Sequence, residues 1–141
     1  VSIRKERYSH DIISETGEFV VNLTTEELCH ATDYCGVRSG RDVDKFKEMH
    51  LTAEKASKIK APLIGESPVN LECKVVDVKE LGSHDMFIAQ VVAVHVDEKY
   101  LDDKGRLDLG KANLITYSHG EYFGLGKKLG KFGYSVEKKN K

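Results

Sequence analysis

The stretch Y-C-G-V-R-S-G-R-D-V-D-K-F, from Tyr34 to Phe46, decides how the rest of this chain is interpreted. It combines two glycines and a serine with two arginines and a lysine, Lys45. Glycine lets backbone N–H groups approach a ligand closely, and successive N–H groups in such a turn form a concave nest that attracts anions. Lys45 adds a compact positive charge. The stretch therefore indicates a phosphate or carboxylate pocket, although a polar loop between two helices has the same composition.

Length and charge describe one ordinary globular domain that covers residues 1–141. Of the 141 residues, 40% are hydrophobic and 32% are charged, which is typical of a compact domain. The net charge of −1 gives no general attraction to nucleic acid. No apolar run is long enough to span a bilayer. We therefore expect a single domain that binds neither nucleic acid nor a membrane.

The cysteines and histidines show no spacing typical of a structural or metal site. Cys29, Cys35 and Cys73 form no C-x-x-C pair, so they match neither a disulfide framework nor a zinc site. A reducing, cytoplasmic compartment is expected. The six histidines lack mutual metal-ligand spacing, so no metal is expected. The chain opens at Val1 on what reads as the end of a strand, which suggests that N-terminal strands are missing.

The first half of the sequence predicts short helices around one strand. Ser9 is placed to cap a helix from His10 to Thr16, and Gly17 is placed to end it. The β-branched run from Phe19 to Leu23 predicts a buried strand. Three further segments are expected to be helical or partly helical: Glu26 to about Tyr34, Asp42 to Met49, and Leu51 to Lys60.

Two long strands dominate the second half. Val69 to Leu81 alternates apolar and polar residues, with a change of phase near Val75 that predicts a bulge. His84 to Val96 is apolar on both faces, which fits a barrel strand that is also covered on its outside. A short last strand is expected from Leu114 to Tyr117. Because no regular crossover helices separate the strands, the sequence predicts a mainly β protein, an antiparallel barrel with short helical insertions.

Several side chains could contact a ligand, and each also has a purely structural interpretation. Ser9 either caps a helix or offers its hydroxyl beside free helix N–H groups, with Arg7 next to it. His84 follows a tight turn and is either a surface histidine or a ligand contact. Tyr117 is either a core residue or a phenol that stacks on a planar ligand. Cys35 is either a small buried hydrophobe or a redox-active thiol.

Taken together, the segments resemble the flavin reductase-like, FMN-binding split-barrel family, which includes flavoredoxins and ferric reductases. The combination C-G-x-x-S-G-R-D-x-D-K-F followed by G-x-H-x-x-F is the most specific part. Six stretches match in family order: R-Y-S-H-D-I-I at 7–13, G-E-F-V-V-N at 17–22, the stretch at 34–46, A-P-L-I-G-E-S at 61–67, L-E-C-K-V at 71–75 and L-G-S-H-D-M-F-I-A-Q-V at 81–91.

The resemblance implies an antiparallel Greek-key split barrel that forms a homodimer, with FMN near the subunit interface. By matching motif, Ser9 contacts FMN, Lys45 meets its phosphate and Tyr117 packs on it. His84 lies at the flavin and is the candidate catalytic residue on the nicotinamide side. The same motifs also contain Arg7, Cys35, Ser39 and Gly40 as cofactor-binding candidates. Family members carry an earlier strand pair with an asparagine and often a tryptophan, neither of which occurs before Val1.

The activity implied by the resemblance is that of an FMN-containing oxidoreductase. It would take a hydride from NADH or NADPH, or electrons from a redox partner, and pass them to free flavin, ferric iron or a protein acceptor. One alternative is a non-catalytic FMN-binding electron-transfer module without its own NAD(P)H site, and another is an interaction domain without flavin. No protein nucleophile is required, because the flavin itself carries the hydride and electron chemistry.

Overall fold

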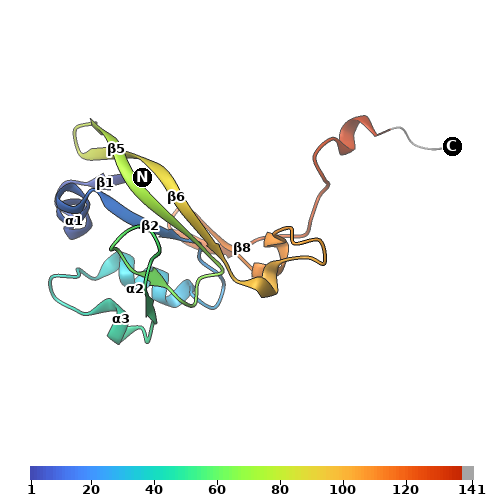
Figure 1. Cartoon of the computed structure of the whole chain (residues 1–141), viewed down its shortest axis with the longest axis horizontal. Helices are drawn as coiled ribbons and strands as arrows, with labels where there is room; N and C mark the ends of the chain where they lie inside the picture. Colours follow the sequence, from blue (N-terminus) through green and yellow to red (C-terminus); the bar gives the residue numbers. More distant parts are fainter. Residues whose placement is uncertain (138–141) are drawn as a thin grey trace.

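The computed structural model describes residues 1–137 and confirms the predicted mainly β architecture (Figure 1). A curled antiparallel sheet has the strand order β1-β6-β5-β2. Its strands are β1 (Ser2–Arg4), β6 (His84–Val96), β5 (Val69–Glu80) and β2 (Glu18–Asn22). Two small sheets pair β3 (Ala53–Glu54) with β4 (Leu63–Ile64), and β7 (Ile115–Ser118) with β8 (Glu121–Gly124). The helical elements are α1 (Tyr8–Thr16), α2 (Cys29–Val37), α3 (Lys45–Glu48) and three 3₁₀ turns, Glu98–Tyr100, Leu109–Ala112 and Tyr134–Val136.

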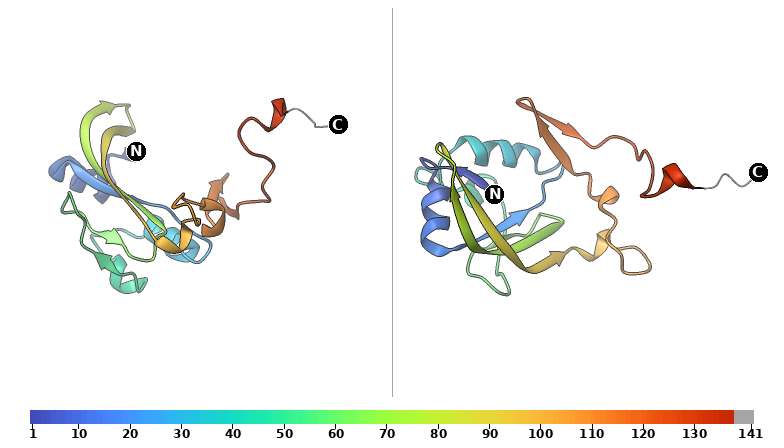
Figure 2. Two further views of the ribbon diagram at one scale, coloured as in Figure 1. Left: turned by 45° about the vertical axis from the view of Figure 1, so that its right-hand side comes forward. Right: turned by 90° about the horizontal axis from the view of Figure 1, so that it is seen from above.

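The long hairpin of β5 and β6 is the centre of the sheet. Its register shifts between Val75 and Asp77, which confirms the bulge expected near Val75. A second shift lies between Glu72 and Cys73. Bulges bend the strand and increase its local twist, and Figure 2 shows the resulting curl of the hairpin.

The segment between β3 and β4 covers one face of the sheet. Ala56 and Ile59 of this segment, together with Leu63 of β4, are buried and pack against Val20 of β2 and Val92 of β6. The prediction of partly helical structure from Leu51 to Lys60 was wrong, because the segment contains β3 and irregular backbone instead. Its N–H groups bond to side-chain oxygens of the sheet, which satisfies them without a helix.

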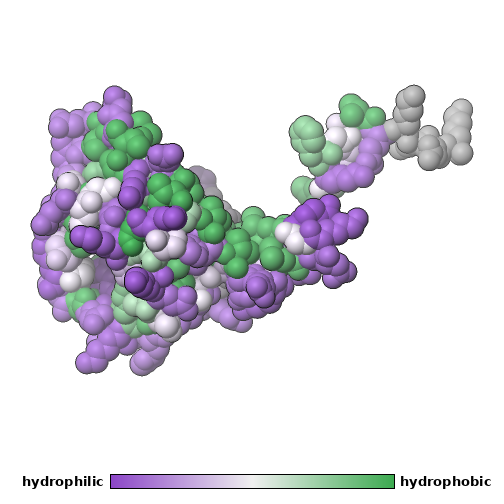
Figure 3. Space-filling view, viewed as in Figure 1, coloured by the Kyte–Doolittle hydropathy of each residue, from purple (hydrophilic) through white to green (hydrophobic). Residues whose placement is uncertain are grey.

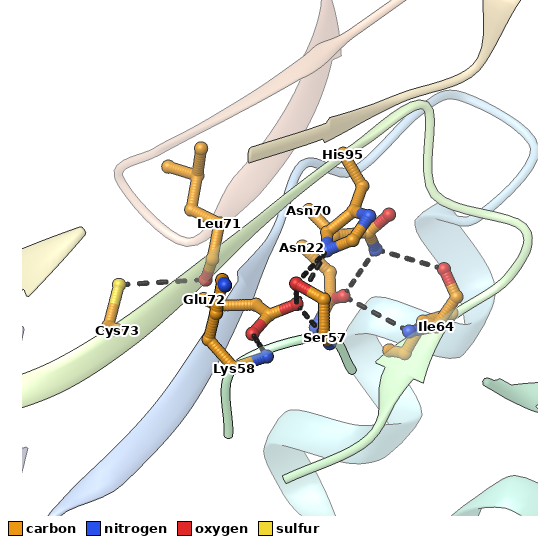
Figure 4. Close-up of polar contacts among 9 residues, drawn as sticks. All are labelled: Asn22, Ser57, Lys58, Ile64, Asn70, Leu71, Glu72, Cys73 and His95. Atoms are coloured by element: carbon orange, nitrogen blue, oxygen red, sulfur yellow. Dashed lines mark hydrogen bonds and ion pairs between the residues drawn. The ribbon is translucent and has the colours of Figure 1, made fainter. Parts of the chain in front are cut away.

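A buried carboxylate fixes this covering segment to the sheet (Figure 4). Glu72 of β5 is fully buried and accepts hydrogen bonds from the Ser57 N–H and Lys58 N–H, each at 2.7 Å. It also accepts from the Ser57 hydroxyl at 2.9 Å, and its Oε1 lies 2.5 Å from His95 Nε2. Burial alone would raise the pKa of Glu72, but the hydrogen bonds from Ser57, His95 and Lys58 lower it to about 2. The carboxylate is therefore ionised over the physiological range.

Within residues 1–137, the outside of β6 is not covered in the way that its apolar faces led us to expect. Ile88, Val91 and Val94 are 40%, 49% and 56% exposed. β1 pairs only with the beginning of β6, and from Ile88 to Val96 the outer edge of the strand has no partner within residues 1–137. Figure 3 shows apolar side chains along this hairpin.

The ends of α1 were predicted with mixed success. Gly17 ends the helix with a φ of 69°, and its N–H donates to the Ile13 carbonyl at 2.8 Å, which confirms its role as the C-terminal residue. Ser9 does not cap the helix, because α1 begins at Tyr8 and Arg7 occupies the N-cap position. No side chain bonds to the first N–H groups of α1 from that position.

The segment around α2 is displaced along the chain relative to the prediction. Residues 25–28 form a turn in which the Thr25 hydroxyl accepts from the Leu28 N–H at 3.3 Å, so the helix begins only at Cys29. It then continues through Gly36, so part of the Tyr34–Phe46 stretch is helix and not loop.

Of the helices in residues 1–137, none has the length and apolar character needed to cross a membrane.

Candidate functional site

A cleft of about 910 Å³ lies between α1 and the Tyr34–Phe46 stretch, which is the region that the sequence indicated as an anion pocket. Ligand sites commonly have volumes of roughly 300–1,000 Å³. The cleft is built from the end of β1, the first turns of α1, the end of α2 and the loop that leads into α3. Six of the predicted site residues line it: Arg7, Ser9, Cys35, Ser39, Gly40 and Lys45.

The N-terminus of α1 opens on this cleft. The first N–H groups of a helix have no partner within the helix, and they carry the positive end of its dipole. Tyr8 and Ser9 line the cleft at this end, and no N-cap side chain competes for their N–H groups. Arg7 reaches across to α2, with its Nη1 3.5 Å from the Gly36 carbonyl. The arrangement presents free donors and a hydroxyl to an anion.

The loop after α2 packs against the same helix. The Arg41 guanidinium lies 4.5 Å from the centre of the Tyr8 ring and forms an ion pair with Asp11. A β-carbon at Gly40 would lie 3.3 Å from the Tyr8 ring, so glycine allows the close approach of loop and helix. The Ser39 hydroxyl accepts from the Arg41 N–H at 3.2 Å and tightens the turn.

Lys45 is positioned at the end of α2. Its ammonium donates to the Cys35 carbonyl at 2.6 Å, in the last turn of the helix where the dipole favours a cation. Asp44 caps α3 by accepting from the Lys47 N–H at 3.2 Å, which fixes the backbone beside Lys45. An ammonium has three N–H donors, so two remain for a ligand in the cleft.

Cys35 shares this position, but its thiol is not activated. Burial raises the pKa of the Cys35 thiol, and the nearby Lys45 charge only partly opposes that effect. The thiol is therefore protonated at neutral pH, and a thiolate is the reactive form of cysteine. Of the two interpretations from the sequence, the structure favours the small hydrophobe that lines the cleft.

His84 lies beside the cleft and does not line it. It begins β6 opposite Arg4 of β1, and its Nδ1 is 2.8 Å from the Ser83 hydroxyl. Glu6, which does line the cleft, has a lowered pKa: a hydrogen bond from its own backbone lowers it, burial opposes this, and the charges of Arg4 and His84 add to the lowering. His84 is therefore close enough to affect the ionisation of Glu6, a carboxylate in the wall of the cleft.

Tyr117 is separate from the cleft within one chain. It lies on β7 and is 65% exposed, and its ring centre is 5.1 Å from that of Tyr122 on β8. The Tyr122 hydroxyl donates to Asp33 of α2 at 3.2 Å, which ties the β7–β8 hairpin to that helix. The pairing of β7 with β8 was not predicted from the sequence.

One pair of residues near the site was also missed. His10 Nε2 lies 2.7 Å from an Asp85 carboxylate oxygen, and Asp85 is only 6% exposed. The hydrogen bond from His10 lowers the pKa of Asp85 despite its burial, and the charge of Lys5 adds to that effect. The pair joins α1 to β6 beside Ser9 and His84. Each member directly follows a residue singled out in the sequence, but 75 positions separate them, so only the fold brings them together.

The comparisons with known proteins define the class. Residues 1–126 match the flavin reductase like domain, and the chain therefore belongs to the flavin reductase-like family. Its fold is that of the split-barrel proteins of this family. The flavoredoxin of Desulfovibrio vulgaris (Miyazaki F) is 30% identical, with a TM-score of 0.87 over 96% of this chain and 73% of that one.

Two further relatives bear on the chemistry. An FMN-binding protein from Thermus thermophilus is 26% identical, with a TM-score of 0.77 over 93% of this chain and 71% of that one. A ferric-chelate reductase (NAD(P)H) from Archaeoglobus fulgidus is 28% identical over 90% of this chain and 68% of the relative. This chain spans only about half to two thirds of the length of three other relatives, namely 62%, 47% and 57% of their residues.

Proposed function

We propose that this chain binds FMN in the cleft between α1 and the loop that leads into α3, and that it acts as a flavin-dependent oxidoreductase. The observation that carries the proposal is the convergence of Lys45 and the uncapped N-terminus of α1 on one cleft. Together they suit the phosphate of FMN, a dianion that both a cation and helix N–H groups attract. The relationship to an FMN-binding protein supports the same ligand.

The remaining lining residues suit the rest of the cofactor. Four cations, Arg7, Arg38, Arg41 and Lys45, line the cleft together with three carboxylates, and of these cations Arg41 is paired with Asp11. Ser9 and Ser39 offer hydroxyl groups, and Gly40 allows the backbone to approach a ligand. Apolar side chains complete the walls: Ile3, Ile12, Val43 and Phe46. Residues of these kinds fit an amphipathic ligand with a charged end and a flat apolar ring.

The chemistry follows from these positions. Bound FMN would supply the acceptor for two electrons, and the protein would hold and orient it. We propose His84 as the residue on the nicotinamide side, where its imidazole can donate a hydrogen bond. Electrons would come from NADH or NADPH, as the name of the ferric-chelate reductase suggests, or from a redox partner. They would pass to free flavin, ferric iron or a protein acceptor.

A second candidate is a non-catalytic electron-transfer module that binds FMN without an NAD(P)H site. The position of His84 outside the cleft lining favours this candidate, as does the similarity to a flavoredoxin. Stopped-flow mixing of the FMN-loaded protein with NADH and with NADPH separates the two. Rapid bleaching of the flavin supports the reductase, and an unchanged spectrum supports the module.

The assembly and location complete the proposal. We propose a single domain over residues 1–141 that forms a homodimer in which the exposed Tyr117 of one copy contacts the flavin of the other, since Tyr117 lies outside the cleft of its own chain. Cys29, Cys35 and Cys73 form no disulfide, which suits a reducing, cytoplasmic compartment.

The proposal is tested by comparing FMN with riboflavin, which has the same ring but no phosphate. We expect the purified protein to be yellow or to become so with FMN, and to bind FMN at least about tenfold more tightly than riboflavin, since a charge-assisted contact contributes roughly 1.5–3 kcal/mol. Equal affinity for the two, or binding of neither, would contradict the proposed site.

A further inference from the structure

The C-terminal segment from Leu125 to Glu137, here called the arm, extends away from the rest of the molecule (Figure 1). Leu129, Phe132 and Val136 are 84%, 107% and 82% exposed. Beyond Leu125, the hydrogen bonds and the ion pair of the arm join arm residues to one another within the described chain. Such a run of exposed large apolar side chains is typical of a surface that another protein covers.

The arm and the body carry opposite charge. The arm contains three lysines and one glutamate and so carries +2, whereas residues 1–124, with 16 of the 22 basic and 22 of the 23 acidic residues, carry −6. Lys127, Lys128 and Lys131 interleave with the apolar residues of the arm. The arm therefore suits a surface that is both apolar and acidic.

Such a surface lies where the arm begins. Residues 24–37 and 113–126, which contain α2 and the β7–β8 hairpin, include no lysine or arginine. The exposed carboxylates of this surface belong to Glu26, Glu27, Asp33 and Glu121. The same surface contains a dent of about 180 Å³ with apolar and aromatic walls, lined by Glu26, Cys29, Ile115, Tyr122, Phe123 and Gly124, and Asp33 accepts a hydrogen bond from the Tyr122 hydroxyl. Aromatic and apolar centres with polar rims are typical of protein interfaces.

We propose that two copies of this chain exchange their arms, so that the arm of each lies on the α2/β7–β8 surface of the other. Phe132 is the anchor that enters the dent, and Lys127, Lys128 and Lys131 face the carboxylates of this surface. This inference rests on the homodimer of the proposed function, and the exchanged arms are the contacts that hold that dimer together.

The geometry is compatible with a two-fold axis. The arm leaves the body at Gly124, which itself lines the dent. When two such surfaces face each other, each arm starts beside the dent of the other copy, as an isologous interface requires. From Leu125 to Phe132 an extended chain reaches roughly 20–25 Å, which is sufficient to cross to a facing copy. The similarity to the flavoredoxin fold, which covers 96% of this chain, extends into the arm.

Charge reversal in two variants of the full chain tests the exchange. The arm variant carries Lys127→Glu, Lys128→Glu and Lys131→Glu, and the surface variant carries Glu26→Lys, Asp33→Lys and Glu121→Lys. Each alone brings like charges together, so we expect both to sediment as monomers at micromolar concentration where the unaltered chain is a dimer. In an equimolar mixture, one copy of each variant can pair. The acidic arm of the arm variant then meets the basic surface of the surface variant, and the basic arm of the surface variant meets the acidic surface of the arm variant, so we expect dimers to form again.

The control reverses three exposed lysines that make no ion pair within residues 1–137: Lys47→Glu, Lys55→Glu and Lys104→Glu. It should remain dimeric. A monomeric unaltered chain, a dimeric arm variant, or a mixture that stays monomeric would each overturn the proposal, provided that circular dichroism shows folded variants. FMN titration of the same samples tells failure of the exchange from failure of the flavin site, because an unaltered chain that binds FMN and yet is monomeric refutes only the exchange.

Discussion

The Lys45 ammonium lies 2.6 Å from the main-chain carbonyl of Cys35, so the last turn of α2 holds the cation that begins α3. This contact makes the Tyr34–Phe46 stretch one structural unit. It fixes a flexible side chain at the cleft without using all its donors, which lowers the entropic cost of ordering it around a ligand.

Replacing Lys45 tests its role at the phosphate. Lys45→Ala should weaken FMN binding by roughly ten- to a hundredfold, because a charge-assisted hydrogen bond is lost. It should leave riboflavin binding nearly unchanged, because riboflavin has no phosphate. Flavin fluorescence titration measures both affinities, with Lys47→Ala as the matched control two residues away and outside the cleft. Equal weakening for both flavins would assign Lys45 to folding of the loop instead.

Replacing His84 tests the proposed nicotinamide side. In His84→Ala, FMN affinity should stay within about threefold, while reduction by NADH or NADPH at full FMN occupancy should slow by roughly tenfold or more. Stopped-flow absorbance of the flavin band gives the rate. Ser83→Ala is the control, because it removes only the group 2.8 Å from Nδ1. Unaltered reduction kinetics in His84→Ala would remove this histidine from the mechanism.

Thiol labelling tests where the flavin binds. The raised pKa of Cys35 predicts slow reaction with a disulfide reagent at neutral pH and an increase in rate as the pH rises above the ordinary range of a thiol. FMN should slow labelling of Cys35 further, because Cys35 lines the cleft. Cys29 lies at the opposite end of α2 and serves as the internal control. Mass spectrometry of the modified peptides measures both, and protection of Cys29 alone would move the flavin away from the cleft.

The buried carboxylate of Glu72 predicts a pH dependence of stability. Its pKa is lowered from 4.5 to about 2 by folding, so its contribution is fully present above pH 4.5 and is lost as the pH falls from about 4.5 to 2. Glu72→Gln should lower Tm at pH 7 by more than about 5 °C, because an amide cannot accept hydrogen bonds through its NH₂ group.

The same variant should lose less stability than the unaltered chain over the acid range. Thermal unfolding followed by circular dichroism at several pH values checks both expectations. Glu66→Gln is the control, since Glu66 is exposed and, within the described part of the chain, its carboxylate accepts hydrogen bonds from Thr52. Parallel stability curves for Glu72→Gln and the unaltered chain between pH 4.5 and 2 would contradict the role of Glu72.

Sequence reasoning predicted best the features set by neighbouring residues. The alternation from His84 to Val96 gave a strand with those bounds, and the phase change near Val75 corresponds to a bulge. Gly17 ends a helix, because a residue in the left-handed region is needed there. The grouping of glycines and cations from Tyr34 to Phe46 located the cleft.

Sequence reasoning failed where the partner is distant along the chain. Glu72 looks like an outward polar residue in an alternating strand, but it is buried because N–H groups of Ser57 and Lys58 meet it. Leu51 to Lys60 contains helix-forming residues, yet its backbone bonds to the sheet instead. Ser9 has the right chemistry for a cap, but helix α1 starts at Tyr8, two residues earlier than a Ser9 cap requires.

The sequence by itself determined the two long strands, the end of helix α1, the family and the stretch that forms the cleft, because periodicity, backbone sterics and motif order are local properties of the chain. Only the tertiary structure decided that α1 and Lys45 share one cleft, that His10 meets Asp85, and that Tyr117 lies apart from them. Contacts between residues so far apart in the sequence depend on how the curled sheet brings its segments together, and the periodicity of the sequence does not predict which segments meet.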